Sequence, residues 1–194
     1  MEHLRLSGCC SAVTDKRLSL LPLVYMVFAL VATAASIQLT PPGKVADEMP
    51  HFARAVFLSE GKVVGRRLSP VASGGLLPCN FNLVYLDFQR PPSRRLEPGT
   101  LETFTDRPWN RELCFVGFPN TVIYAPFTYI PAAVTVWGAR HAHLTIIQTS
   151  YAVRFVNGLV SVVLCTVGIA LARRGALLLA VIASMPMVMT LAGS

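Results

Sequence analysis

The sequence has few charged residues for its length. Only 14% of its 194 residues are Asp, Glu, Lys or Arg, whereas soluble domains usually carry about 25%. Four stretches of 18 or more residues contain no charged side chain at all. A wholly soluble protein is therefore not expected, and the composition predicts a mainly α-helical integral membrane protein.

The sequence also lacks the motifs of common enzyme classes. It contains no Gly-x-Ser-x-Gly elbow, no phosphate-binding glycine loop and no Cys-x-x-Cys pair. The three apolar stretches that we expect to span the membrane contain no Asp, Glu, Lys, Arg or His, although proton and ion pathways usually need such a side chain. We therefore expect no enzymatic activity, no cofactor, and no transport of ions by this chain itself.

Five cysteines are too few and too scattered for a disulfide-rich scaffold. Only Cys79 and Cys114 share a polar segment, so a single intramolecular disulfide is the most that the sequence supports. That bond requires an oxidising compartment, and two free thiols are the alternative. No Asn-x-Ser/Thr glycosylation site occurs.

The net charge of +7 comes largely from arginines that are dispersed in pairs. There is no basic helix or ladder of aromatic and basic residues of the kind that follows a phosphate backbone, so nucleic acid is not an expected partner. Anionic lipids and other membrane subunits are expected instead. The candidate residues for a lipid headgroup are Arg173, Arg174 and Arg140.

Three of the uncharged stretches are predicted to span the membrane. After a tail at residues 1–17, the first transmembrane helix is predicted at 18–40, and Pro41, Pro42 and Gly43 end it. A cleavable signal peptide is the alternative for this stretch. A helical hairpin is predicted at the C-terminus, with transmembrane helices at 155–172 and 176–192.

The predicted hairpin has a stripe of small residues at four-residue spacing. Small residues let helices approach closely in lipid, where the hydrophobic effect does not drive association. We expect this stripe to pack against a helix of a partner subunit. It consists of Ala172, Ala176, Ala180 and Ser184.

Residues 113–154 are predicted to form an aromatic segment at the membrane interface. The uncharged part contains Pro119, Pro126 and Pro131, which argues against a full span. Its tyrosine, phenylalanine and tryptophan side chains suit the boundary between lipid and water. A segment that lies on the membrane surface, or that enters and leaves on one side, is therefore expected.

Residues 41–112 are predicted to form a loop-rich, partly β segment in water. Asp47 and Glu48 before Pro50 favour a helix over Pro50–Glu60. Ser69–Pro78 is predicted to be a connector, Asn80–Phe88 a strand that can pair with a second strand at Leu113–Phe118, and Arg90–Arg111 an extended arm. We expect this segment to depend on partners for its order because its apolar stretches are short.

Three histidines deserve comparison with metal sites. His141 and His143 lie two residues apart, and His51 is the only other candidate ligand of this type within the water-facing part. A metal site or an intramembrane enzyme built on them is an alternative hypothesis. The interpretation that we favour is that His141 and His143 meet water and lipid headgroups beside an aromatic segment.

Together these features favour a non-catalytic accessory subunit of a large membrane complex. A respiratory-chain or ATP synthase assembly of the mitochondrial inner membrane is the leading hypothesis. It depends on short spans, an arginine-rich arm and the absence of glycosylation sites. The alternative is a secretory-pathway or cell-surface membrane protein with a ligand-binding ectodomain, which a Cys79–Cys114 disulfide would favour.

Overall fold

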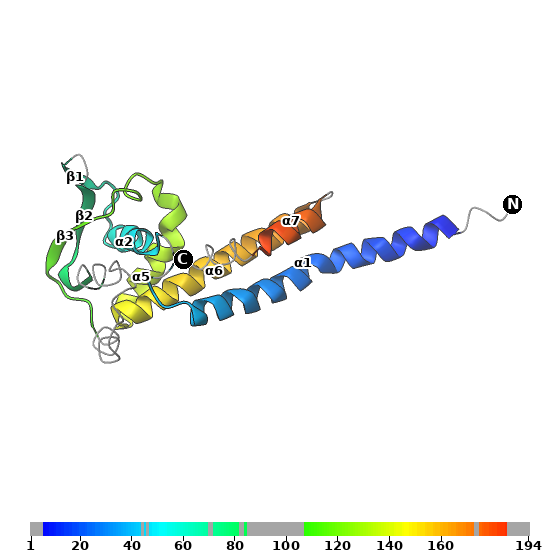
Figure 1. The fold of residues 1–194 in the computed structure, drawn as a ribbon, viewed down its shortest axis with the longest axis horizontal. Coiled ribbons are helices and arrows are strands. Elements are labelled where there is room, and N and C mark those ends of the chain that lie inside the picture. Colours follow the sequence, from blue (N-terminus) through cyan, green and yellow to red (C-terminus); the bar gives the residue numbers. More distant parts are fainter. Residues whose placement is uncertain are drawn as a thin grey trace, which may run out of the picture.

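The structure is a computed structural model. It describes residues 6–43, 45, 47–69, 72–81, 84, 107–172 and 175–185, with side chains from Leu20 onward. Long helices form a rod, and shorter helices and a small sheet form a head at one end of it (Figure 1). The rod consists of α1 (Leu6–Leu39), α6 (Ile146–Leu171) and α7 (Ala176–Ala183).

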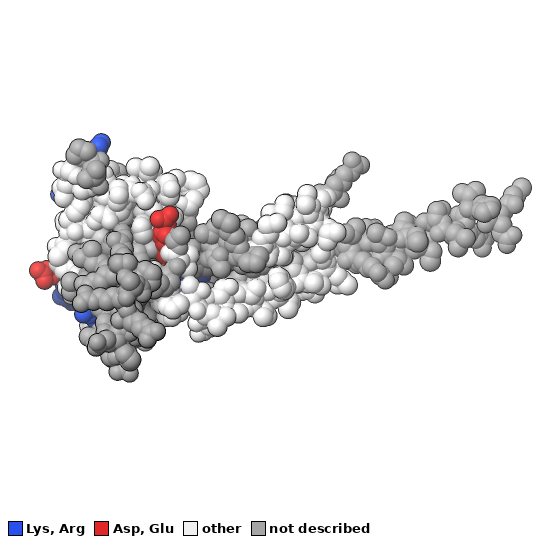
Figure 2. Space-filling view, viewed as in Figure 1, with Lys and Arg blue, Asp and Glu red and all other residues white. Residues whose placement is uncertain are grey.

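Two helices within the described residues are long and apolar enough to cross a membrane. These are the Leu20–Leu39 part of α1 and the whole of α6. They pack side by side along the rod, and the described surface of the rod is uncharged over most of its length (Figure 2). Most of their large apolar side chains are exposed, as lipid contact requires.

Both long helices begin earlier than predicted. α1 starts at Leu6 and not at residue 18, so residues predicted as a tail continue the helix. α6 starts at Ile146 and not at residue 155. Thr145 and Gln148 form a reciprocal capping box there, in which each side chain accepts a hydrogen bond from the other residue's backbone N–H. The head and the second span therefore share one continuous helix.

The predicted hairpin packs within the chain. Ala180 is buried in a cluster with Tyr25 and Ala29 of α1 and Val162 and Ile169 of α6. α7 lies beside the end of α6 that is farthest from the head (Figure 1). We expected Ala180 to pack against a helix of a partner subunit, but in the structure it packs against α1 and α6 of the same chain.

The four small residues do not form one helical stripe. Ala172 follows the last residue of α6 in an extended conformation, so its spacing is not continued through the turn before Ala176. Ala176 is partly buried against the same cluster as Ala180. Ser184 lies just beyond α7, where its hydroxyl donates to the carbonyl of Ala180. Residues 186–192 of the predicted third span lie outside the described residues.

The head contains a three-stranded antiparallel sheet in the order β1, β2, β3. β1 is Arg66–Ser69, β2 is Ala72–Pro78 and β3 is Leu113–Gly117. The predicted connector Ser69–Pro78 is therefore wrong, because most of it forms the central strand. Gly75 permits this, since a Cβ there would lie 2.2 Å from the ring of Phe57, and glycine lets α2 approach the sheet.

The predicted strand Asn80–Phe88 is also wrong at the three residues of this range that the structure describes. Its described residues Asn80, Phe81 and Val84 are helical. Phe81 and Val84 are both buried in the head core, and a spacing of three residues places side chains on one face of a helix but on opposite faces of a strand. The partner of β3 is consequently β2 and not this segment.

Helix α2 (Glu48–Ser59) packs against the sheet and against α5 (Ile130–His141). This confirms the predicted helix near Pro50–Glu60, with Phe52 and Val56 buried on its inner side. A 3-10 helix, η1 (Pro126–Tyr129), leads into α5. Residues 113–154 therefore form β3, η1, α5 and the start of α6.

The head has a hydrophobic core that the sequence did not predict. Buried side chains from α2, β2, β3, α5 and the first turns of α6 form one cluster. Residues predicted to lie at the membrane interface, such as Val116, Ala132 and Ile146, supply much of it. The short apolar stretches fail to suggest a core individually, but they bury one another when the chain folds. Most of the predicted arm, residues 85–106, lies outside the described residues.

Candidate functional site: a pocket between the head and the spans

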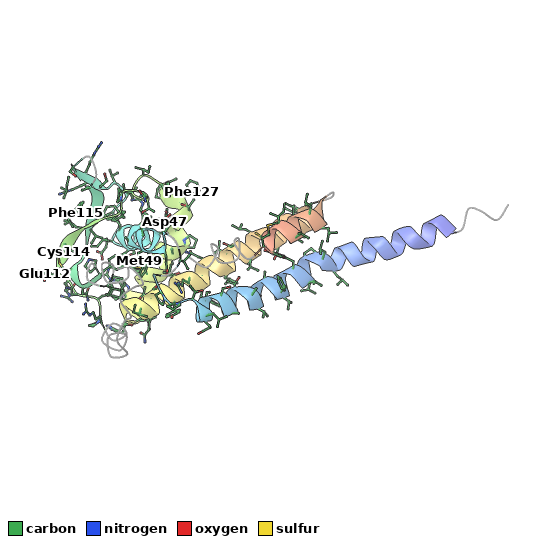
Figure 3. All side chains as sticks on the ribbon, viewed as in Figure 1. Asp47, Met49, Glu112, Cys114, Phe115 and Phe127 are labelled. Atoms are coloured by element: carbon green, nitrogen blue, oxygen red, sulfur yellow. A yellow bond between two sulfur atoms is a disulfide. The ribbon has the colours of Figure 1, made fainter. Side chains whose placement is uncertain are left out.

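A pocket of about 920 Å³ lies where the head meets α6. This volume is within the usual range of small-molecule sites. Asp47 and Phe127, which belong to its lining, lie on the side of the head that faces the rod (Figure 3). α2 and the segment before it, η1 with α5, and one face of α6 supply the walls. The lining residues are Asp47, His51, Phe52, Tyr124, Ala125, Phe127, Thr128, Tyr129, Pro131, Ala132, Val153, Asn157, Val160, Ser161 and Leu164.

The α6 wall extends from the head into the apolar rod. Val153, Asn157, Val160, Ser161 and Leu164 follow one another at three- and four-residue spacing, which is one face of a helix. At about 1.5 Å per residue, this face is about 16 Å long, which is roughly half of a 30 Å hydrocarbon core. The pocket is therefore partly a groove along the span.

His51 and Tyr129 form the polar end of the pocket. The Tyr129 hydroxyl and His51 Nδ1 are 2.8 Å apart, and the two rings stack with centroids 5.7 Å apart. Burial raises the pKa of Tyr129 to about 12, so the phenol keeps its proton. Burial lowers the pKa of His51, against the opposing effect of the Asp47 carboxylate. Burial therefore favours the neutral imidazole, in which one ring nitrogen donates and the other accepts.

Helix α2 also holds the loop that carries Tyr124. The Thr121 hydroxyl donates to the carbonyl of Pro50 at 2.8 Å. The buried Arg54 guanidinium donates to the carbonyls of Val63 and Tyr124 at 2.9 and 3.1 Å. These bonds tie the aromatic wall to α2, so the position of α2 decides the shape of the pocket.

A buried ion pair fixes α2 on the spans. Arg154 of α6 donates from Nε and Nη2 to the two carboxylate oxygens of Glu48, each at 2.6 Å. Both side chains are only 2% exposed. A planar guanidinium bound by two parallel hydrogen bonds is the strongest common geometry for such a pair. We call Glu48 and Arg154 the junction ion pair.

The remaining donors of Arg154 bind the end of the first span. Arg154 Nη1 donates to the carbonyl of Thr40 at 2.6 Å, and Nη2 donates to that of Pro41 at 3.1 Å. Glu48 in turn accepts from the backbone N–H of Gly43 at 2.7 Å. These contacts hold the backbone of the segment that directly follows α1. The junction ion pair thus joins α1, α2 and α6 at one point.

Asp47 stands beside this junction in an unusual backbone conformation. Its φ of 58° lies in the left-handed region, which costs a residue other than glycine roughly 1–3 kcal/mol. Its side chain makes no capping bond to α2 and is exposed. The Asp47 carboxylate therefore lies at the pocket and does not cap α2.

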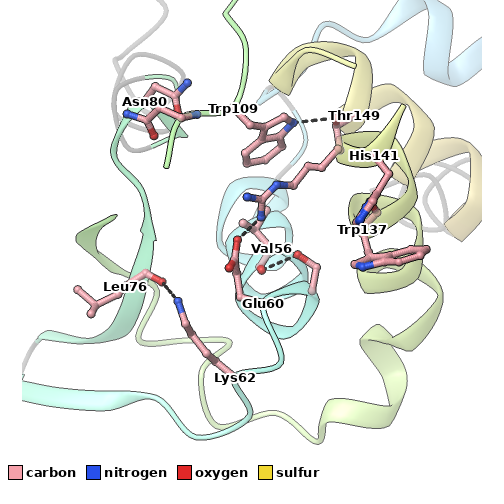
Figure 4. A network of polar contacts seen from close by, with 12 residues as sticks. Val56, Glu60, Lys62, Leu76, Asn80, Trp109, Trp137, His141 and Thr149 are labelled. Atoms are coloured by element: carbon pink, nitrogen blue, oxygen red, sulfur yellow. Dashed lines mark hydrogen bonds and ion pairs between the residues drawn. The ribbon is translucent and has the colours of Figure 1, made fainter. Parts of the chain in front are cut away.

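Arg140, predicted to bind a lipid headgroup, is used within the head. It forms an ion pair with Glu60 and lies over the ring of Trp109, 5.3 Å from its centroid (Figure 4). Trp109 also donates from its indole N–H to the Thr149 hydroxyl at 3.3 Å. Arg140 therefore links α5 to the end of α2, and Trp109 connects it to α6. Arg173 and Arg174 lie outside the described residues.

The predicted cysteine pair is joined, whereas the histidines are separate. Cys79 and Cys114 form a disulfide that links the end of β2 to β3. His51 lines the pocket, but His141 is exposed at the end of α5. In the part of the chain that the structure describes, no three His, Cys, Asp or Glu side chains are grouped to hold a metal ion.

Sequence reasoning missed Glu48, Arg154 and the pocket itself. From the sequence, Glu48 is only a favourable charge at a helix start, and Arg154 is only the residue before a predicted span. The two residues are 106 positions apart, so no local pattern relates them. One available signal was that Arg154 directly adjoins an apolar stretch, where a charged residue requires a partner.

A family model described as "Predicted membrane protein (DUF2142)" matches residues 28–194, which is most of the chain. The matched range includes the junction ion pair, the pocket and the disulfide. No curated protein and no solved structure matches the chain.

The protonation of His51 predicts that acid destabilises the head. Because burial lowers the pKa of His51 in the folded protein, the unfolded chain binds more protons below about pH 6.5. The free energy of unfolding should therefore fall as the pH drops through that value. His51→Gln should reduce this fall, measured as the shift in Tm of the purified protein. His141→Gln is the control, and an equal effect of both changes would contradict the assignment to His51.

Proposed function

Because the chain belongs to the DUF2142 family of predicted membrane proteins, we propose that it is a membrane protein whose head binds an amphipathic ligand from the bilayer. The observation that carries this proposal is the pocket at the junction. Its polar end is in the head, and its α6 wall continues into the apolar rod. A ligand with a polar head and a hydrocarbon tail would match both parts.

The position of α5 supports a head that rests on the bilayer. α5 runs across the direction of α1 and α6, on the side of the head where the rod begins (Figure 1). The exposed side chains of η1 and α5 include Phe127, Ile130, Val134 and Trp137. Such a row of apolar and aromatic side chains suits the interface between lipid and water, and it adjoins the pocket through Phe127.

The disulfide favours a head on the oxidising side of its membrane. Disulfides such as Cys79–Cys114 persist in secreted, surface and luminal proteins and are rare where thiols are kept reduced. This favours the secretory-pathway or cell-surface alternative over the mitochondrial inner membrane. The proposed topology has three spans, with the head on the oxidising side and the turn between α6 and α7 on the other.

The accessory-subunit hypothesis remains as a second candidate. The exposed large apolar side chains of α1, α6 and α7, such as Val31, Leu171 and Leu178, would suit partner helices as well as lipid. In that case the outer faces of the rod, and not the pocket, would carry the function.

Cysteine labelling tests the three-span topology. Single cysteines replace Ser7, Leu68 and Gly193 in a chain whose other free cysteines are serine, and an impermeant maleimide is applied to sealed vesicles of known orientation. Leu68→Cys and Gly193→Cys should react from one side and Ser7→Cys only from the other. Reaction of Ser7→Cys and Leu68→Cys from the same side would contradict the topology. Reaction of Gly193→Cys together with Ser7→Cys would leave two spans.

Photo-crosslinking distinguishes the two candidate functions. A benzophenone amino acid replaces Thr128, which lines the pocket, or Ile123, which is 80% exposed outside it. After irradiation in native membranes, the Thr128 variant should carry an adduct of lipid mass that the Ile123 variant lacks. A protein adduct at Thr128 would show that a protein, and not a lipid, occupies the pocket. The absence of a specific adduct at Thr128 would contradict ligand binding.

A further inference from the structure

The charges around the pocket restrict the ligand that it can accept. The described lining contains one carboxylate, that of Asp47, and neither lysine nor arginine. The buried Arg54 donates to backbone carbonyls behind the Tyr124 wall and is absent from the lining. An anionic head would give up part of its hydration in the pocket, where the described lining offers no cation in return and presents a carboxylate of the same sign.

A cationic head would gain little at the same place. Asp47 is exposed to solvent, and an exposed ion pair contributes little to affinity because water and salt screen it. The neighbouring His51 and Tyr129 are kept neutral by burial. The remaining polar side chains of the lining are uncharged as well.

These uncharged groups offer hydrogen-bond donors and acceptors together. The neutral imidazole of His51 has one donating and one accepting ring nitrogen, and its Nδ1 forms the hydrogen bond with the Tyr129 hydroxyl. Asn157 and Ser161, on the α6 wall, each provide a donor and an acceptor. A hydroxyl both donates and accepts, so hydroxyl groups can satisfy this mixture where a purely accepting or purely donating head cannot.

The groove also determines where the tail must lie. Beyond Asn157, the α6 wall presents Val160 and Leu164, and Phe127 faces the same space from η1. Apart from Ser161, this end of the lining is apolar, and it belongs to the part of α6 that is apolar enough to cross the membrane. A tail placed there exchanges bilayer lipid for similar apolar contacts, so the head must supply the selectivity.

We propose that the pocket selects an uncharged lipid with a hydroxyl-bearing head, such as a glycolipid or a glyceride. Its hydroxyl groups bind Asp47, His51 and Asn157, and its tail follows α6 past Leu164. This inference rests on the proposed function, since it specifies the ligand of the same pocket. It adds that phosphate-headed and ammonium-headed lipids are poor ligands.

Photoreactive lipids with one common diazirine tail test the selectivity. The full chain is placed in phosphatidylcholine nanodiscs with a trace of glucosyl diacylglycerol, diacylglycerol, phosphatidic acid or an ammonium-headed lipid. Adducts on α6 are then quantified by mass spectrometry. At least one hydroxyl-headed probe should give about tenfold more adduct than the two charged probes, as a few well-formed hydrogen bonds would produce. The two hydroxyl-headed probes distinguish a glycolipid from a glyceride.

Matched variants separate pocket binding from ordinary contact with lipid. Leu164→Trp fills the groove and should abolish the excess adduct of the hydroxyl-headed probe. Val163→Trp adds the same bulk at an exposed neighbouring position outside the lining and should leave that excess unchanged. Asp47→Asn removes the repelling charge and should raise the phosphatidic acid adduct relative to the native chain, which a loss of structure would not do.

Each remaining outcome overturns a defined part of the account. If a charged probe labels the native chain as well as the hydroxyl-headed probes do, and Leu164→Trp removes that label, the ligand class is wrong while the proposed function stands. If no probe gives an adduct that depends on Leu164, the pocket binds no lipid, and the proposed function fails together with the inference.

Discussion

The junction ion pair is the interaction on which the rest of the structure depends. Arg154 belongs to α6, and Glu48 begins the first helix of the head. Both side chains also bind the backbone of the segment that directly follows α1. Two buried charges cost several kcal/mol each to desolvate, and that cost is offset only when geometry and hydrogen bonding are nearly complete. The pair therefore allows one placement of α2 on the rod and penalises others.

That placement creates the pocket. Asp47 directly precedes Glu48, and His51 follows it within one helical turn. Helix α2 also holds the loop of Tyr124, through hydrogen bonds that involve Thr121 and Arg54. On the opposite wall, Val153 and Asn157 lie on either side of Arg154 along α6. The residues that determine the fold and those that would contact a ligand are thus neighbours in the sequence. The elements that the junction ion pair holds together, with the loop of Tyr124, η1 and α5, therefore supply the described lining of the proposed lipid site.

The sequence predicted the features that depend on local patterns. Charge-free stretches indicated a membrane protein, in agreement with the family match; Asp47, Glu48 and Pro50 indicated α2; and the shared polar segment singled out Cys79 and Cys114. It failed where distant contacts decide the structure. β2 is a strand because β1 and β3 pair with it despite its glycines, and Phe81 joins a core assembled from five elements. Arg154 continues α6 because a carboxylate 106 residues away neutralises it.

A double-mutant cycle on the junction ion pair tests the central claim most directly. The free energy of unfolding would be measured in bicelles for the native chain, Glu48→Gln, Arg154→Met and the double variant. Each single change should cost about 3–5 kcal/mol, because it leaves one buried charge without its partner. The double change should cost at least about 2 kcal/mol less than the two single costs combined. Costs that add to within about 0.5 kcal/mol would show that the two residues act independently, and the account of how the head is held on the spans would be wrong.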